Sequence, residues 1–175
     1  MAGAPGAFTM GWRAGENAAL YALRQKISPE LDAKEHEQLQ ELVLGMLNNR
    51  RGLHWREVEI ALQNTLDYYA GNIRTAKVLE RGIERLDFIK QNAQFGASNP
   101  HEMMRSLEVC SVIDNAEMIF KSSLERRESR RAPFGFSRAD FPEQDDENWL
   151  AFLAIKRKGS SGVAFSRIPI RQENA

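Results

Sequence analysis

The sequence has 175 residues, of which 42% are hydrophobic and 27% are charged, and its 24 basic and 24 acidic residues cancel to a formal net charge of zero. This size and composition are typical of one soluble domain with its own core, and the charge balance argues against a dedicated nucleic-acid binder. The single cysteine, Cys110, excludes an internal disulfide and a cysteine-based metal site.

No hydrophobic run approaches the roughly 20 residues that a membrane-spanning helix needs. The first residues also lack the basic start and continuous apolar segment of a signal peptide. We therefore expect no direct insertion into a membrane.

The N-terminal stretch is rich in small residues and predicts a helix over residues 9–24. One face of that helix consists of Gly11, Ala14, Gly15, Ala18, Ala19 and Ala22. Such a face lets a helix lie very close to another backbone, so we expect packing against a sheet or a ligand. The preceding "GAPGAFTMG" would present free N–H groups to an anionic or electron-rich group, although a disordered tail before the helix is the simpler alternative.

Helical periodicity continues through the middle of the chain. The pattern predicts helices over residues 32–48, 55–69, 73–94 and 100–127. Asn99 followed by Pro100 is a favourable N-cap and first-turn pair for the last of these. That helix is apolar on more than one face, so we expect it to be the central helix of the bundle.

The segment 126–150 combines charges and aromatic residues in an irregular pattern. Its arginines are Arg126, Arg127, Arg130, Arg131 and Arg138. Its acids are Glu128, Asp140, Glu143, Asp145, Asp146 and Glu147, and its aromatic residues are Phe134, Phe136, Phe141 and Trp149. Arginine–carboxylate pairs can fix irregular backbone, and the aromatic residues predict partial burial. Arginine with phenylalanine would also suit single-stranded nucleic acid, but the nearby acids would repel phosphate.

The last part of the chain predicts a β-hairpin, with strands over residues 149–157 and 163–168 around "GSSG". The fold class is therefore mainly α: a bundle of three to four helices, an irregular Arg/Asp-rich loop and a short C-terminal hairpin. His36, His54 and His101 lie on different predicted elements without metal-ligand spacing, so we predict no metal site and no catalytic residue.

The stretch "RRESRRAPFGFSRADFPEQDDENWL" resembles a signature of the succinate dehydrogenase, fumarate reductase and adenylylsulfate reductase flavoprotein superfamily. The matching residues are Arg126, Glu128, Ser129, Arg130, Arg138, Asp140, Pro142, Asp145, Asp146, Asn148 and Trp149. Many family members carry Gly-x-His after the E-S-R, whereas this chain has Arg131, Ala132 and Pro133. That departure favours an adenylylsulfate reductase-like or less characterised branch.

The resemblance covers nearly the whole chain and implies about the last quarter of such a subunit. It implies that residues 1–27 end an FAD-binding domain and that residues 28–175 form the C-terminal helical domain. Backbone groups of Gly3, Ala4, Pro5 and Gly6 would then lie near the flavin. The roles implied for Arg126, Glu128, Arg130, Arg138, Asp140, Asp145, Asp146 and Trp149 are structural or interfacial, with none of them catalytic.

The implied partners are the FAD-binding remainder of the flavoprotein and an iron–sulfur electron-transfer subunit, with no nucleic acid. The implied location is cytoplasmic, with partner subunits as the route to any membrane association. Because the nucleotide fingerprint and substrate site of the family are not in this sequence, we expect no turnover and no stable FAD binding by the chain alone. The alternative is a separately encoded interaction subunit that completes a flavoprotein without catalysis of its own.

Overall fold

The computed structural model describes residues 4–25, 32–130, 136–158 and 162–170. By its internal contacts the chain divides into two compact units, residues 1–40 and residues 41–175.

The first unit is dominated by helix α1, Ala4–Arg24. It begins five residues earlier than the predicted start at residue 9, so residues 4–6 form its first turn and are not a preceding turn. A proline is tolerated there because the N–H groups of the first turn have no helical partner. Gly11 and Gly15 have open space beside them. Six large apolar side chains of this helix are exposed: Phe8, Met10, Trp12, Leu20, Tyr21 and Leu23.

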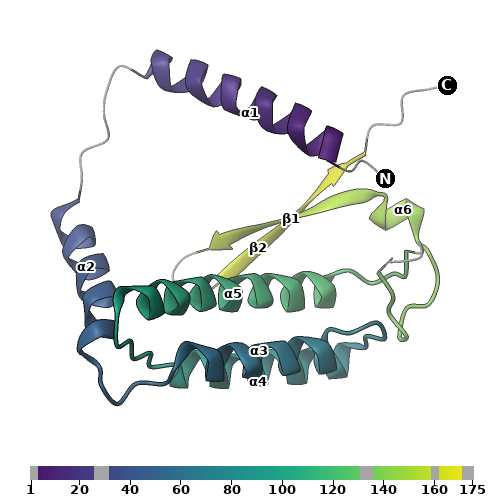
Figure 1. The fold of residues 1–175 in the computed structure, drawn as a ribbon. Helices are drawn as coiled ribbons and strands as arrows, with labels where there is room; N and C mark the ends of the chain where they lie inside the picture. Colours follow the sequence, from purple (N-terminus) through teal and green to yellow (C-terminus); the bar gives the residue numbers. More distant parts are fainter. Residues whose placement is uncertain (1–3, 26–31, 131–135, 159–161, 171–175) are drawn as a thin grey trace. The chain divides into compact units, whose positions relative to one another are not determined.

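The second unit is built around three helices that pack against one another (Figure 1). They are α3 (Trp55–Tyr69), α4 (Ala76–Asn92) and α5 (Pro100–Glu125). Helix α2, Ala33–Asn48, crosses from the first unit into the second and contributes Met46 to the core. The predicted four helices of the middle region are therefore confirmed, and the side chain of Asn99 caps α5 as expected by accepting from the N–H of Glu102.

The core lies between α3, α4 and α5 and includes Leu62, Leu79, Leu86 and Phe120, which are almost fully buried. Gly82 of α4 lies against the Phe120 ring, and a Cβ at this glycine would be 2.3 Å from Cε1 of Phe120. The missing side chain therefore allows α4 and α5 to approach at the point where the fully buried Phe120 ring is placed.

Helix α3 is capped by His54, which the sequence pattern did not predict as a capping residue. The Nδ1 atom of His54 accepts a hydrogen bond from the backbone N–H of Arg56 at 3.3 Å. This bond satisfies one of the N–H groups that a helix start leaves without a partner.

We expect His54→Ala to lower the free energy of unfolding by about 1 kcal/mol because the cap is lost. His54→Asn should retain most of the stability, since asparagine is a good N-cap residue. Urea unfolding of the three proteins checks this, and equal losses in the two variants would contradict the capping role.

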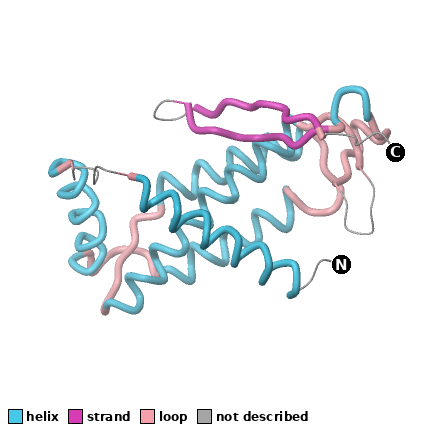
Figure 2. The backbone as a smooth tube through the Cα atoms, turned by 90° about the horizontal axis from the view of Figure 1, so that it is seen from above, coloured by secondary structure: helices cyan, strands magenta, loops and turns pink. Residues whose placement is uncertain are grey.

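The chain ends in the predicted hairpin, formed by strands β1 (Ala151–Lys158) and β2 (Gly162–Pro169) (Figure 2). The strands are antiparallel, with Ala151 opposite Pro169 and Leu153 opposite Arg167. Strand β1 starts two residues later than predicted because Asp146–Trp149 forms a single helical turn, α6, capped by Asp145. The hairpin contacts α5, and the mainly α fold class is confirmed.

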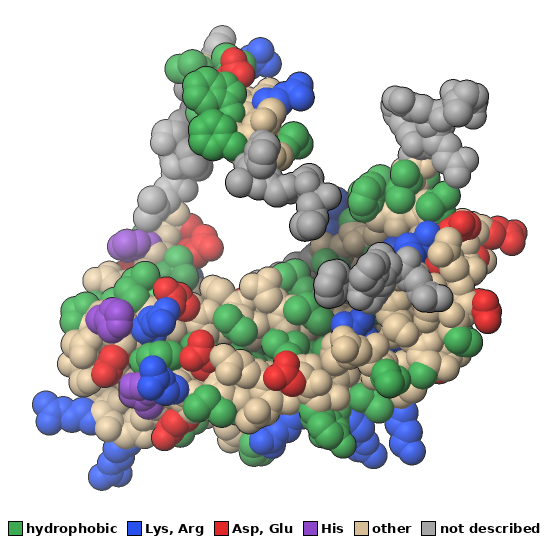
Figure 3. Space-filling view, turned by 45° about the vertical axis from the view of Figure 1, so that its right-hand side comes forward, with side chains coloured by type: hydrophobic (Ala, Val, Ile, Leu, Met, Phe, Trp, Pro, Cys, Tyr) green, Lys and Arg blue, Asp and Glu red, His purple; other side chains and the backbone are tan. Residues whose placement is uncertain are grey.

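No helix within the described ranges is long and apolar enough to cross a membrane. Basic, acidic and hydrophobic side chains are interspersed over the helical body (Figure 3), in keeping with the zero net charge of the sequence.

Candidate functional site

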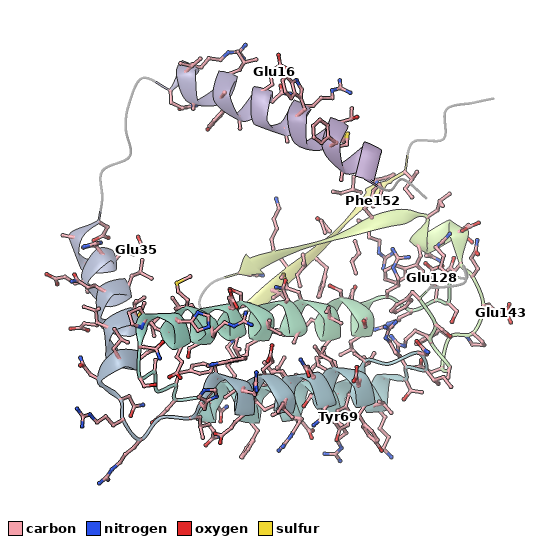
Figure 4. All side chains as sticks on the ribbon, viewed as in Figure 1. Glu16, Glu35, Tyr69, Glu128, Glu143 and Phe152 are labelled. Atoms are coloured by element: carbon pink, nitrogen blue, oxygen red, sulfur yellow. The ribbon has the colours of Figure 1, made fainter. Side chains whose placement is uncertain are left out.

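A dense polar site lies where α5 leads into the irregular loop, at the end of the bundle marked by Glu128 (Figure 4). Six charged residues form it, and we call them the arginine network: Arg126, Glu128, Arg130, Arg138, Asp140 and Asp146. They come from the C-cap of α5, the loop and the start of α6.

Glu128 is at the centre of the network and has no exposed surface. Its carboxylate accepts two parallel hydrogen bonds from Arg130, each 3.0 Å long, and another from Nη1 of Arg126. The backbone N–H of Asp145 donates a fourth bond at 3.1 Å. A buried carboxylate is tolerated when it is both ion-paired and fully hydrogen-bonded. The Glu128 carboxylate meets both conditions and binds two arginines and the backbone of Asp145, the cap of α6.

Arg130 extends the network to the surface. Its Nη2 atom lies 2.8 Å from Oδ1 of Asp146 in addition to its bonds with Glu128. The carboxylates raise the pKa of Arg130, with Glu128 as the main cause, and the Arg130 guanidinium lowers the pKa of Asp146. Both groups therefore stay charged at neutral pH.

Arg138 forms the second half of the network, with only 1% of its surface exposed. Its Nη1 atom donates toward the carbonyl oxygens of Ser123 at 2.6 Å and Arg126 at 3.0 Å. The last carbonyls of a helix have no partner within the helix, so this guanidinium caps the C-terminus of α5. Its other side makes a bidentate pair with Asp140, at 2.8 Å and 2.7 Å.

Asp140 connects Arg138 to the start of α4, because its Oδ2 atom also accepts from the N–H of Ala76 at 2.8 Å. The Arg138 guanidinium is the main cause that lowers the pKa of Asp140 from its ordinary 3.8 to about 2. One carboxylate thereby fastens the loop to two different helices.

The ionised form of Asp140 is stabilised by folding, so its contribution to stability is present above pH 3.8 and is lost as the pH falls through about 2. After allowance for solvent screening of this partly exposed group, we expect that contribution to be about 1 kcal/mol. A carbon chemical-shift titration of the Asp140 carboxyl should have its midpoint near 2, and it should not change in Arg81→Gln, which alters a distant exposed arginine. A midpoint near 3.8 would contradict the Arg138–Asp140 pairing.

The network also holds the hairpin. Nη2 of Arg126 donates to the carbonyl oxygen of Ala151, the first residue of β1, at 2.8 Å. Trp149 is buried beside it, with the guanidinium carbons of Arg167 at 3.9 Å and Arg126 at 5.4 Å from its ring centroid. The start of β1 is therefore fixed to the end of α5.

Ser129 is a further part of the site that the charge pattern did not emphasise. It is buried, and its Oγ accepts from the N–H of Arg138 at 2.8 Å. Its own N–H donates to the carbonyl of Glu143 at 2.9 Å. These bonds close the loop on itself, so the ion pairs and the backbone support the same conformation.

The structure places most of the residues singled out in the sequence close together, but it gives them different structural roles. Asp145 caps α6, where its carboxylate accepts from the N–H of Asn148 at 3.0 Å, and this bond is the main cause that lowers its pKa. Ala4, Pro5 and Gly6 lie in the first turn of α1, in the other unit. Gly3, Arg131 and Phe134 lie outside the described residues.

Arg74 was missed because its contacts are far away in the sequence. Its guanidinium caps α3 by donating to the Ala70 carbonyl and lies 5.1 Å from the ring centroid of Phe136. Nothing local in the sequence signals that the loop returns to this arginine.

This arrangement can hold elements together, but its groups are poorly suited to acid–base or nucleophilic chemistry. The neighbouring arginines favour the ionised forms of Asp140 and Asp146, so the lowered pKa values of these two carboxyl groups make them weak bases. Burial raises the pKa of the Cys110 thiol, which disfavours the reactive thiolate. Within the described ranges, no group of three or more His, Cys, Asp or Glu side chains is placed to hold a metal ion.

Comparison with known proteins identifies the family to which this chain belongs. Residues 59–175 match the sequence model of the family described as fumarate reductase flavoprotein C-term. The chain is 28% identical over 178 residues to the fumarate reductase flavoprotein subunit of Mycobacterium tuberculosis, which covers 95% of this chain and 30% of that relative. It is 26% identical over 137 residues to L-aspartate oxidase of Yersinia pestis, over 77% of this chain and 23% of the relative.

Solved structures show the same fold. Adenylylsulfate reductase from the hyperthermophilic Archaeoglobus fulgidus superposes with a TM-score of 0.83 and 27% identity, over 91% of this chain and 28% of that chain. The Mycobacterium smegmatis Sdh1 complex gives a TM-score of 0.77 at 24% identity, over 93% and 29% of the two chains, and supports the fold alone. The chain thus spans less than a third of the length of these relatives.

Proposed function

Because this chain belongs to the fumarate reductase flavoprotein C-terminal family, we propose that it is the helical C-terminal domain of an FAD-dependent oxidoreductase and has a structural and docking role in it. The observation that carries this role is the internal pairing of the arginine network. Glu128 has no exposed surface and Arg138 has 1%, so neither side chain can reach a substrate or a partner directly. The network is accordingly a clasp inside the domain, which sets the positions of α4, α5 and the hairpin.

The docking part of the proposal is supported by surfaces that the chain leaves uncovered. Helix α1 exposes six large apolar side chains, and the hairpin exposes Phe152 and Ile168, which lie opposite each other. Contiguous exposed apolar surface is typical of interaction sites. The partners proposed are the FAD-binding remainder of the flavoprotein and an electron-transfer subunit with iron–sulfur centres.

The cofactor of the complete protein would be FAD, which supplies the two-electron chemistry when bound. In this proposal residues 1–27 complete the FAD-binding domain, and backbone groups of residues 3–6 lie near the flavin. The residues present fit that role, because α1 begins at Ala4 and the backbone N–H groups of Ala4 and Gly6 in its first turn are free to donate to an electron-rich group, while Pro5 has no N–H. The small residue types at these positions leave room for a close approach of the backbone.

The structural role can be tested in a chimeric protein, called the joined protein below. In the joined protein, this chain replaces the C-terminal region of the Mycobacterium tuberculosis fumarate reductase flavoprotein subunit, either unchanged or with Arg130→Ala. We expect the variant to lower the yield of assembled, FAD-containing protein while turnover per bound FAD stays the same. A variant that assembles normally, keeps its FAD and loses only turnover would contradict the proposal.

The second candidate is a separately encoded subunit with the same docking role. It is favoured by the second unit, residues 41–175, which is compact and has a core of its own. Co-expression of the chain with a family flavoprotein that lacks its C-terminal region tests this candidate: recovery of a stable complex supports it, and failure of the two polypeptides to associate contradicts it.

A further inference from the structure

A groove of about 510 Å³ lies between α5 and β1, and we call it the α5–β1 groove. Its apolar lining includes Met118 and Ile119 of α5 and Phe152 and Leu153 of β1. The charged residues that line it are two arginines, Arg74 and Arg126, without an acidic residue among the described lining. The groove therefore combines apolar walls with two guanidinium groups, of which that of Arg126 is already paired with Glu128.

The edge of β1, not one of its faces, borders this groove. Ala151, Phe152 and Leu153 are consecutive lining residues, and successive side chains of a strand point to opposite faces. The described sheet has β2 on the other side of β1, so this edge has no strand partner within the described residues. The carbonyl of Ala151 already accepts a bond from Arg126 at this edge, which shows that its backbone groups face outward.

The register identifies which other backbone groups face outward. Ile170 N–H donates to the Leu150 carbonyl, so residues 150 and 170 form a hydrogen-bonded pair. Because such pairs alternate along an antiparallel ladder, Ala151, Leu153 and Ile155 direct their backbone groups away from β2. Pro169 of β2 lies opposite Ala151, so its backbone nitrogen also points away from the partner strand. The N–H that proline lacks therefore costs no hydrogen bond between the two strands.

Arg74 gives the groove a charge that the chain itself does not neutralise. Its guanidinium donates to the Ala70 carbonyl, and no carboxylate within the described ranges pairs with it. Burial, followed by the nearby Arg138, lowers the pKa of Arg74. A half-buried cation in this setting is stabilised by an anionic group from outside the chain.

We propose that the α5–β1 groove receives an extended, acidic segment of the FAD-binding part of the flavoprotein, which adds as a strand to β1 and pairs a carboxylate with Arg74. Strand addition uses the free edge for affinity and side-chain contacts for specificity. The relatives extend far beyond the region that this chain matches, so the FAD-binding part proposed as the partner is the natural source of the segment. The inference rests on the proposed function and assigns one of its contact surfaces.

Hydrogen exchange on the joined protein described above tests the strand addition. In the isolated chain the amides of Leu153 and Ile155 should exchange rapidly, because they face outward. In the joined protein they should exchange at least about tenfold more slowly, while FAD is bound stoichiometrically. If FAD binds and these amides stay unprotected, the groove inference is wrong and the proposed function stands. If neither the joined protein nor the two pieces expressed together assemble with FAD, the proposed function and the inference both fail.

Two pairs of variants distinguish the effects of the β1 edge and of the Arg74 charge from a general loss of side-chain packing. Leu153→Pro removes one outward N–H without removing a ladder bond, as Pro169 does on β2, and Leu153→Ala is its control for the lost side chain. Arg74→Gln removes the charge, and Arg74→Lys keeps it. We expect Leu153→Pro and Arg74→Gln to abolish the protection at Ile155, while both controls retain it. Equal behaviour within each pair, in variants whose isolated chains remain folded by circular dichroism, would overturn the proposal.

Discussion

Replacement of Glu128 by glutamine is expected to lower the free energy of unfolding of the chain by about 3–5 kcal/mol, which is the usual cost of breaking a buried ion pair by removing one partner. Glu128 has no exposed surface and is paired with both Arg126 and Arg130. Glutamine has nearly the same shape, but it is neutral and offers one acceptor oxygen where the carboxylate offers two. Two guanidinium groups would then remain partly buried without their counter-charge.

Urea unfolding followed by tryptophan fluorescence measures this change. The matched control is Glu84→Gln, because Glu84 is also paired with an arginine, Arg81 at 2.7 Å, but 63% of its side chain is exposed. Exposed pairs of this kind contribute little to stability, because solvent screens their charges. If the two variants lose similar stability, Glu128 is not the centre of the clasp.

Gly82→Ala is expected to lower the free energy of unfolding by about 1–3 kcal/mol, the typical cost of overpacking a core. The added Cβ would lie 2.3 Å from Cε1 of Phe120 and 2.8 Å from Cβ of Tyr69, so at least one helix must shift. Phe120 has no exposed surface and cannot turn into solvent. This cost opposes, and should exceed, the intrinsic preference of a helix for alanine over glycine.

For Gly45→Ala in the same protein we expect the opposite change in stability. Gly45 is also in a helix, α2, but a Cβ there meets nothing within 4 Å. We therefore expect it to raise stability by about 0.5–1 kcal/mol through helix propensity alone. Thermal and urea unfolding should show opposite signs for the two glycines, and a loss at Gly45 equal to that at Gly82 would refute the close approach of α4 and α5.

The helices of the middle region could be predicted because their apolar spacing and caps are local signals. Their ends were less predictable. The third predicted helix was expected to start at residue 73, but α4 starts at Ala76, because Arg74 forms a bridge with Arg138 and Thr75 caps the helix. The long helix was expected to reach residue 127, but α5 ends at Glu125, where Arg138 binds its last carbonyls. In both cases a contact with the distant Arg138 lies at the boundary, together with the local Thr75 cap at the start of α4.

The members of the arginine network could be chosen from the sequence, but their pairing could not. Arg138 pairs with Asp140, two residues away, while Glu128 collects both Arg126 and Arg130. Many arginines and acids in segment 126–150 could pair in other ways, and only the path of the loop, fixed partly by Ser129, selects among them. Helix α6 could not be predicted from the sequence either, because a single turn is too short to produce a periodic pattern of apolar residues.

The resemblance to the flavoprotein superfamily rested on the same segment and is now supported across residues 59–175 by the family match. The structure gives this signature a physical meaning: its buried members, Glu128, Ser129 and Arg138, are held by contacts within the domain. The nearness of residues 3–6 to a flavin, and the two-part division near residue 27, remain predictions.

The central claim is that this chain supplies structure to a flavoprotein and does not itself hold the flavin. The most direct measurement is the visible absorbance of the 175-residue chain after incubation with excess FAD and gel filtration, on protein shown to be folded by circular dichroism. We expect a folded chain that elutes without flavin. Elution with one FAD per chain would contradict it, because the flavin site would then lie within these residues.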